Sequence, residues 1–216
     1  MARIVFDLDG TLIDSAREIQ FVANSLLADR GLEPLTLPET ISFIGNGAGV
    51  LLQKMSAARG IAASEHACLL DTFEERYSKS AEMTEVYPNV RAALTTLLDR
   101  GHRLGICTNK PIVPTQVVLD HLELTPLFEK VLGGNSLPQR KPDPAPLRAV
   151  FDALGDGPVI YVGDSDVDAE TARRADVPFL LFTEGYCKLP HAELPHAALF
   201  SDFAALPGLV DSLLVQ

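Results

Sequence analysis

The sequence predicts an α/β fold, a doubly wound parallel sheet with an all-helical segment inserted after its first strand. Short apolar or β-branched runs recur along the chain and alternate, in its second half, with helical patterns. Between the first two runs, the pattern is instead helix after helix from residue 15 to about residue 83. These two observations together indicate a layered sheet core that carries a separate helical region.

The expected strands are short and regularly followed by helices. They cover residues 3–7, 103–107, 129–133, 158–163 and 178–182, with helical patterns near 112–123, 144–154 and 167–175. Another helix is expected over 88–100, because Pro88 suits a helix start and Gly101 a helix end. This alternation is typical of a Rossmann-like sheet, whose ligands bind beyond the carboxyl ends of its strands.

Residues 15–83 are expected to form a helical cap on a core made of residues 1–14 and 84–216. Helical patterns in the cap close on Gly31 and Gly60, and a third begins at Ser64, a candidate N-cap. An insertion that leaves the sheet after its first strand should cover the ligand crevice as a lid. Its hinges are expected near 13–16 and 82–88.

Composition limits the partners. A net charge of −11 and an isoelectric point near 4.8 argue against nucleic acid or an anionic membrane, since both are negatively charged. The three cysteines are widely spaced, which fits a reducing compartment: Cys68, Cys107 and Cys187. No leader pattern and no apolar stretch of about 20 residues is present. The cytoplasm is the expected location, for a monomer or small homo-oligomer without a macromolecular partner.

Two carboxylates, Asp7 and Asp9, follow the first expected strand. Asp9-Gly10 is a strong turn signal and Asp14 a good N-cap, so a turn alone explains part of the pattern. It does not explain Asp7, because a carboxylate at the end of a buried strand loses hydration unless something compensates it. We therefore favour a metal or phosphate site over a turn alone.

Polar residues also follow the other strands. The second strand is followed by Thr108, Asn109 and Lys110, the third by the segment that contains Lys141, and the fourth by Gly163-Asp164-Ser165-Asp166-Val167-Asp168. Each of these segments has an ordinary explanation when taken alone: Thr108-Asn109 as a turn pair, Lys141 as a surface lysine, and the acidic segment as a helix cap. Together they bring carboxylates, hydroxyl and amide donors and an ammonium to the edge where this architecture binds ligands.

Phosphoryl transfer is the chemistry that needs such a set. Clustered carboxylates repel one another unless they share a cation, and an all-oxygen site suits Mg²⁺. One aspartate could then attack phosphorus while another protonates the leaving oxygen and later deprotonates water. Thr108 and Asn109 could hydrogen-bond the phosphoryl oxygens, and Lys141 could balance the charge.

These motifs resemble, in order, the four motifs of the haloacid dehalogenase superfamily. The resemblance implies Asp7 as nucleophile and metal ligand, and Asp9 as general acid and base that also binds the metal through its backbone carbonyl. It further implies Asp164 as a metal ligand and Asp168 as a supporting carboxylate. Asp166 is left as a charge at a helix start. The dehalogenases themselves are disfavoured, because they lack a residue equivalent to Asp9.

A finer similarity is to phosphoglycolate phosphatases, carried by "FDLDGTLIDS", "FIGNGAGVLL", "GICTNKP", "KPDPAPL" and "YVGDSDVDAETARRADVP". It implies a C1-type cap and hydrolysis of 2-phosphoglycolate to glycolate and phosphate. Asn135 departs from the expected Asp, and the loop 185–197 has no assigned role. The alternatives are a pyrophosphate or sugar-phosphate phosphatase, a phosphonatase or a β-phosphoglucomutase-like enzyme. A phosphorylated receiver-type module is disfavoured by the chain length.

The cap offers one candidate for substrate recognition, the loop Gly45, Asn46 and Gly47. A glycine-rich turn before a helix presents free N–H groups, which suit a small anion such as a carboxylate. The alternative is a plain glycine linker between two helices.

The other side chains of the cap and the histidines are expected to be structural. Arg17 and Glu18 are expected on a solvated helix face, and Phe21, Phe43 and Met55 in the cap core. None of the five histidines has ligand spacing, and His102 is expected at the surface: His66, His102, His121, His191 and His196.

Overall fold

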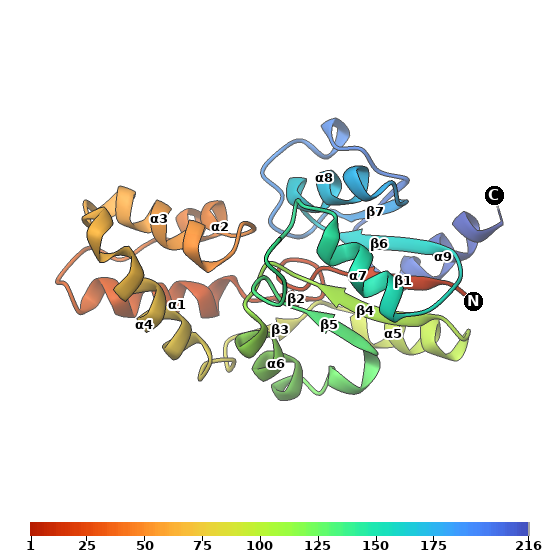
Figure 1. Ribbon diagram of the computed structural model, residues 1–216, viewed down its shortest axis with the longest axis horizontal. Helices are drawn as coiled ribbons and strands as arrows, with labels where there is room; N and C mark the ends of the chain where they lie inside the picture. Colours follow the sequence, from red (N-terminus) through yellow and green to blue (C-terminus); the bar gives the residue numbers. More distant parts are fainter. Residues whose placement is uncertain (216) are drawn as a thin grey trace.

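The computed structural model describes residues 1–215 and has the predicted α/β architecture (Figure 1). Within these residues, six parallel strands form one sheet in the order β5-β4-β1-β6-β7-β8. The strands are β1 (Arg3–Phe6), β4 (Arg103–Cys107), β5 (Lys130–Leu132), β6 (Val159–Gly163), β7 (Phe179–Phe182) and β8 (Ala198–Phe200).

Helices cover both faces of this sheet, which is why its strands are apolar on both sides. In β1, Ile4 and Phe6 join a buried cluster with α5, α6 and α9, whereas Val5 joins the opposite cluster with α7 and α8. The helices are α5 (Val90–Asp99), α6 (Ile112–His121), α7 (Ala145–Ala153), α8 (Asp166–Ala175) and α9 (Leu206–Leu214).

Five of the six strands of this sheet were predicted from the sequence, whereas β8 and α9 were not. β8 has only three residues and directly follows the loop 185–197, to which the sequence assigned no role. It is recognised only through its parallel pairing with β7.

The inserted residues form four helices that lie to one side of the core, far from both termini (Figure 1). They are α1 (Ala16–Ala28), α2 (Leu37–Phe43), α3 (Ala48–Arg59) and α4 (His66–Tyr77). They share a separate buried cluster, in which Met55 is fully buried. Phe21 is 55% exposed, so its predicted place in that core is wrong. Ser64 is not an N-cap, because a 3-10 turn, Ala63–Glu65, precedes α4.

The two chain segments that join helices to core run side by side. β2 (Ile13–Asp14) pairs antiparallel with β3 (Glu85–Val86), within or next to the predicted hinges. Glu18 ties the same junction together: it is buried, and its carboxylate accepts hydrogen bonds from Ser80 Oγ and, at 2.6 Å, from the backbone N–H of Met83. The predicted solvation of Glu18 is therefore wrong. The limits of the cap at residues 15 and 83 stay a prediction.

None of the helices in residues 1–215 has the length and apolar character needed to cross a membrane.

Candidate active site

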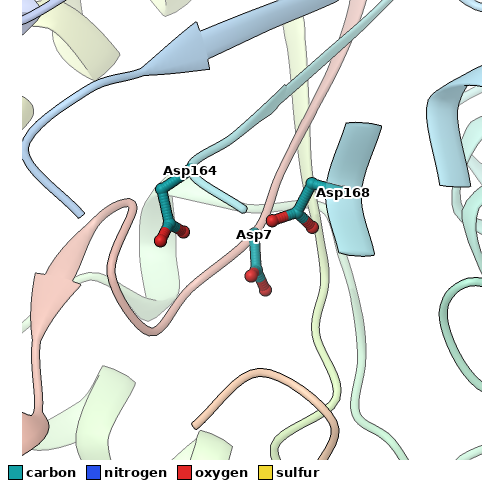
Figure 2. A group of neighbouring side chains, drawn as sticks. All are labelled: Asp7, Asp164 and Asp168. Carbon is teal, nitrogen blue, oxygen red and sulfur yellow. The ribbon is translucent and has the colours of Figure 1, made fainter. Parts of the chain in front are cut away.

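The carboxyl ends of three neighbouring strands meet at one edge of the sheet. Phe6, the last residue of β1, lies in register with Ile106 of β4 and Val162 of β6. Asp7 therefore emerges between the polar segments that follow those two strands. Figure 2 shows the result, with the carboxyl groups of Asp7, Asp164 and Asp168 grouped so that one oxygen of each lies within 4.8 Å of the others. The structure thus brings together residues predicted from two separate motifs, Asp7 from the first and Asp164 and Asp168 from the last.

Asp168 is completely enclosed by hydrogen-bond donors. Its Oδ1 accepts from Lys141 Nζ at 2.8 Å and from the Tyr161 hydroxyl at 2.6 Å. Its Oδ2 accepts from the Ser165 N–H at 3.1 Å and from Ser165 Oγ at 2.5 Å. Burial alone would raise the pKa of Asp168, but Lys141, Ser165 and Tyr161 hold it below the ordinary value. Asp168 therefore serves as a fixed negative charge, with its oxygens already engaged.

Lys141 links Asp168 to Asp7. Its Nζ lies 2.8 Å from an oxygen of each carboxylate and 3.0 Å from the Tyr161 hydroxyl. Burial would lower the pKa of Lys141, but Asp168 and Asp7 outweigh it and raise that pKa above its usual value. The ammonium therefore stays charged and locks the position of Asp7.

Asp7 is buried but incompletely compensated. Burial and the nearby Asp168 raise its pKa to about 7, against the opposing effect of Lys141. Its Oδ1 forms the ion pair with Lys141 but has no hydrogen bond of good geometry among the described residues. An oxygen in this condition has capacity for a metal ion or an electrophile.

Asp164 provides the second carboxylate that suits a metal. Thr11 Oγ1 donates to its Oδ1 at 2.6 Å, and the Tyr186 N–H donates to its Oδ2 at 2.7 Å. Burial, Asp168 and Asp7 together raise its pKa well above the ordinary value. Gly10 makes room for it, since a Cβ there would lie 2.5 Å from Asp164 Oδ2 and its φ is +87°.

These carboxylates fit a hard divalent cation. Two buried carboxyl groups with raised pKa values lack sufficient positive charge, and oxygen ligands are those that Mg²⁺ prefers. Asp168 fits less well as a direct ligand, because its four hydrogen bonds use both oxygens.

Asp9 stands apart from this cluster. Its Oδ1 accepts hydrogen bonds from Ser15 Oγ at 2.6 Å and from Lys110 Nζ at 3.0 Å. Asp9 and Asp7 both line one cavity between the sheet edge and the helical region, hereafter the active-site cavity. Two carboxylates in different environments on one cavity suit two different roles.

Thr108 and Asn109 also line the active-site cavity. Thr108 Oγ1 accepts the Lys110 N–H at 3.1 Å. Asn109 Nδ2 donates at 3.0 Å both to the Gly45 carbonyl of the cap and to the Lys141 carbonyl. The side-chain amide of Asn109 is therefore engaged twice, once with the cap and once within the core.

The cap loop closes the opposite side of the cavity. Gly45 and Gly47 line it, whereas Asn46 is not among its lining residues. Both glycines have positive φ, +114° and +83°, which L side chains rarely adopt. Lys188, from the core loop 185–197, donates to the Ile44 carbonyl at the start of this loop.

A family model described as haloacid dehalogenase-like hydrolase matches residues 4–182. The chain belongs to this family. This hydrolase is 50% identical over 217 residues to a phosphoglycolate phosphatase of Cereibacter sphaeroides, covering 99% of this chain and 100% of the relative. It is 42% identical to a phosphoglycolate phosphatase of Rhodobacter capsulatus, covering 96% of each chain.

A solved structure supports the same placement. The crystal structure of a predicted phosphoglycolate phosphatase from Haemophilus somnus matches this hydrolase with a TM-score of 0.88 and 33% identity, covering 96% of each chain.

Sequence reasoning missed several residues of the site. Lys110 was noted only as part of a strand-end segment, yet its ammonium lies beside Asp9. Ser15 and Tyr186 also contact the site, through Asp9 and Asp164. The adjacency of Lys110 to Thr108 was a usable signal for that residue. Tyr186 gave none, because its contacts join positions more than 20 residues apart.

Proposed function

We propose that this hydrolase is a Mg²⁺-dependent phosphatase that converts 2-phosphoglycolate into glycolate and phosphate. The carrying observation is Asp7, a buried carboxylate locked by Lys141 at a cavity wall, with Asp9 placed separately on the same cavity. The names of the relatives in Cereibacter and Rhodobacter support the substrate. The cytoplasm remains the expected location.

In the first step, Asp7 attacks phosphorus. A bond forms between a carboxylate oxygen of Asp7 and phosphorus, and the bond from phosphorus to the ester oxygen breaks. Asp9 gives its proton to that oxygen, which leaves as the hydroxyl of glycolate. Lys141 keeps Asp7 oriented and balances its charge.

In the second step, water resolves the aspartyl phosphate on Asp7. Asp9 takes a proton from the water, whose oxygen bonds to phosphorus while the bond to Asp7 breaks. The products are phosphate and the regenerated carboxylate. Thr108 and Asn109 contact the phosphoryl oxygens in this proposal, Thr108 through its hydroxyl and Asn109 through its backbone N–H, because the Thr108 N–H donates to the Leu132 carbonyl and the Asn109 side-chain amide is engaged.

The metal would be held by the carboxylates of Asp7 and Asp164 and the backbone carbonyl of Asp9, with Asp168 supporting them. When bound, Mg²⁺ supplies positive charge that offsets the repulsion between carboxylates and phosphate. Asp164 contributes by its fixed orientation, which Thr11 and Tyr186 determine.

The cap loop Gly45, Asn46 and Gly47 receives the carboxylate end of the substrate in this proposal. A phosphate at one end and a carboxylate at the other would then span the cavity from core to cap. Bulky substitution at Gly47 should reduce hydrolysis of 2-phosphoglycolate more than that of neutral phosphate esters. Equal losses on both substrates would remove this role.

The test is phosphate release from a panel with Mg²⁺ or with chelator: 2-phosphoglycolate, pyrophosphate, glucose phosphates and p-nitrophenyl phosphate. We expect a large Mg²⁺-dependent preference in kcat/KM for 2-phosphoglycolate. Even hydrolysis across the panel would keep the aspartate mechanism and reject the substrate. A requirement for a sugar bisphosphate activator would indicate a mutase instead, and no turnover would reject the function.

A further inference from the structure

Lys110 is a buried cation that the proposed mechanism does not use. Its side chain is 2% exposed. Its backbone is fixed on both sides, by the N–H donating to Thr108 Oγ1 at 3.1 Å and the carbonyl accepting the Gly134 N–H at 2.8 Å. The side chain therefore has a defined direction, toward Asp9 and the cap. Burying an ammonium costs free energy unless the charge is paired, so we ask which groups pair with Lys110.

Two groups hold the Lys110 ammonium. Its Nζ lies 3.0 Å from Asp9 Oδ1, and it donates to the hydroxyl of Tyr77, the last residue of α4. The Nζ also lies 4.1 Å from the centre of the Tyr77 ring, a distance typical of a cation–π contact. Lys110 therefore lies where the core and the cap meet.

Comparison with Lys141 shows that the Lys110 ammonium has an N–H donor left for a further partner. An ammonium has three N–H donors. Those of Lys141 meet Asp7, Asp168 and Tyr161, two carboxylates and a hydroxyl. Within residues 1–215, Lys110 has two such partners, only one of them a carboxylate.

Lys110 also differs in charge from the other residues that line the cavity. Among the described residues that line the active-site cavity, it alone has a basic side chain. The cap side of that wall is largely apolar: Ile19, Ile44, Leu51 and Phe73. In such surroundings a charge-assisted hydrogen bond is strong, and an anion without one is costly to bury.

Substrate chemistry then locates the anion that Lys110 would meet. Asp9 must contact the ester oxygen, to which it gives a proton. In 2-phosphoglycolate a single carbon separates that oxygen from the carboxylate. A cation 3.0 Å from Asp9 is therefore within reach of the carboxylate of a substrate placed for reaction.

We propose that Lys110 is a specificity-determining residue, which pairs with a carboxylate one carbon from the ester oxygen of the substrate. Lys110 supplies the full positive charge, and the N–H groups of the cap loop surround the same carboxylate. This inference rests on the proposed function, because it assumes hydrolysis at Asp7 with Asp9 facing the ester oxygen.

The test compares two substrates that differ in one group, 2-phosphoglycolate and 2-hydroxyethyl phosphate. The second replaces the carboxylate by a neutral CH₂OH. We expect K110M to reduce the ratio of their kcat/KM values by about 10–100-fold, the usual loss for a hydrogen bond between charged groups. K110R should restore much of the ratio. K79M is the matched control, because the Lys79 side chain is 70% exposed and, within residues 1–215, forms its ion pair with Glu75 alone.

Each outcome decides between distinct conclusions. Equal losses on both substrates would overturn the inference and leave Lys110 as a positioning residue for Asp9. Unchanged kcat/KM values on both substrates in K110M, with the wild-type preference intact, would reject any role of Lys110 but keep the proposed function. Wild-type protein without any preference for 2-phosphoglycolate would reject the proposed function itself.

A second measurement needs no variant and serves if K110M does not fold. Wild-type protein is assayed with 2-phosphoglycolate and with 3-phosphooxypropanoate, in which the carboxylate lies one carbon further away. Pairing with Lys110 beside Asp9 predicts at least about 10-fold higher kcat/KM for the shorter substrate. Equal or better activity on the longer substrate would overturn the inference.

Discussion

The two walls of the active-site cavity are built in different ways. On the sheet side, Asp168 accepts four hydrogen bonds and Lys141 contacts three oxygens, all buried. On the cap side, the wall consists mostly of apolar side chains and a glycine loop. It is joined to the core by hydrogen bonds to the carbonyls of Ile44 and Gly45 and by the bond from Lys110 to the Tyr77 hydroxyl. The difference teaches that the carboxylates proposed to react are held by a dense hydrogen-bond network, whereas the cap surface opposite them is attached to the core by a few hydrogen bonds.

The strongest test of this contrast is Asp7→Asn. The amide is nearly the same size but a poor nucleophile, so turnover should fall by at least about 10³-fold while the fold persists. Steady-state phosphate release and circular dichroism measure the two effects. Asp166→Asn is the matched control, since Asp166 starts α8 outside the carboxylate cluster, and it should keep activity within about 3-fold. Near wild-type activity of Asp7→Asn would refute the nucleophile.

A second test concerns the metal. Asp164→Ala removes one of the two carboxylates with capacity for Mg²⁺, so the Mg²⁺ concentration for half-maximal activity should rise by about 10–100-fold. A titration of activity with Mg²⁺ measures it. An unchanged titration would show that Asp164 is not a ligand.

A third test concerns the connection between the two regions. The Tyr186 hydroxyl accepts the N–H groups of Ser15 and Ala16, at 2.8 and 3.0 Å, and donates to Asp14 at 2.6 Å. Tyr186→Phe leaves the buried N–H of Ser15 without this partner, whereas the N–H of Ala16 keeps Asp14 Oδ1 at 3.1 Å. The variant should therefore lower the free energy of unfolding by about 1–3 kcal/mol. Urea denaturation measures the loss. Tyr87→Phe, which removes one exposed hydrogen bond of 3.4 Å, should cost much less. Equal losses would contradict the importance of this junction.

The smallest effect is expected at the opposite end of the sheet, where a buried histidine titrates far from the substrate. His102 was predicted at the surface, but it is 6% exposed and its Nδ1 accepts the Ala2 N–H at 3.0 Å. Burial and the nearby N-terminal charge lower its pKa below the ordinary 6.5. Below pH 6.5 the unfolded chain then binds more protons than the folded one. The contribution of His102 to the free energy of unfolding is therefore fully present above pH 6.5 and is lost as the pH falls below it.

His102→Asn should flatten this dependence, because the Asn oxygen can accept the same bond without titrating. Between pH 7 and pH 5 the wild type should lose up to about 1 kcal/mol more than the variant. Chemical denaturation at several pH values measures the difference, and His121→Asn, at an exposed position, should behave as wild type. Identical pH dependence in His102→Asn and wild type would show that His102 does not cause the loss of stability at low pH.

Local sequence was sufficient wherever the chain itself sets the geometry. Five strands, most helices and the positions of Asp7, Thr108 and Asp164 were predicted, because parallel strands deliver the residues after their carboxyl ends to one edge. Asp168 was predicted through the resemblance of its motif, and the structure adds that it forms a capping box with Ser165 within one helical turn. β8 and the burial of His102 were missed, because both depend on neighbours distant in sequence.

The sequence by itself determined the sheet, the inserted helices and the carboxylates of the reaction. Only the tertiary structure decided that Lys141 lies between Asp7 and Asp168, that Lys110 meets Asp9 beneath Tyr77, and that Tyr186 ties Asp164 to the start of α1. The physical reason is that charge pairing and burial depend on distances in space. Residues more than 100 positions apart can form one ion pair, and no local pattern records which of the buried groups will meet.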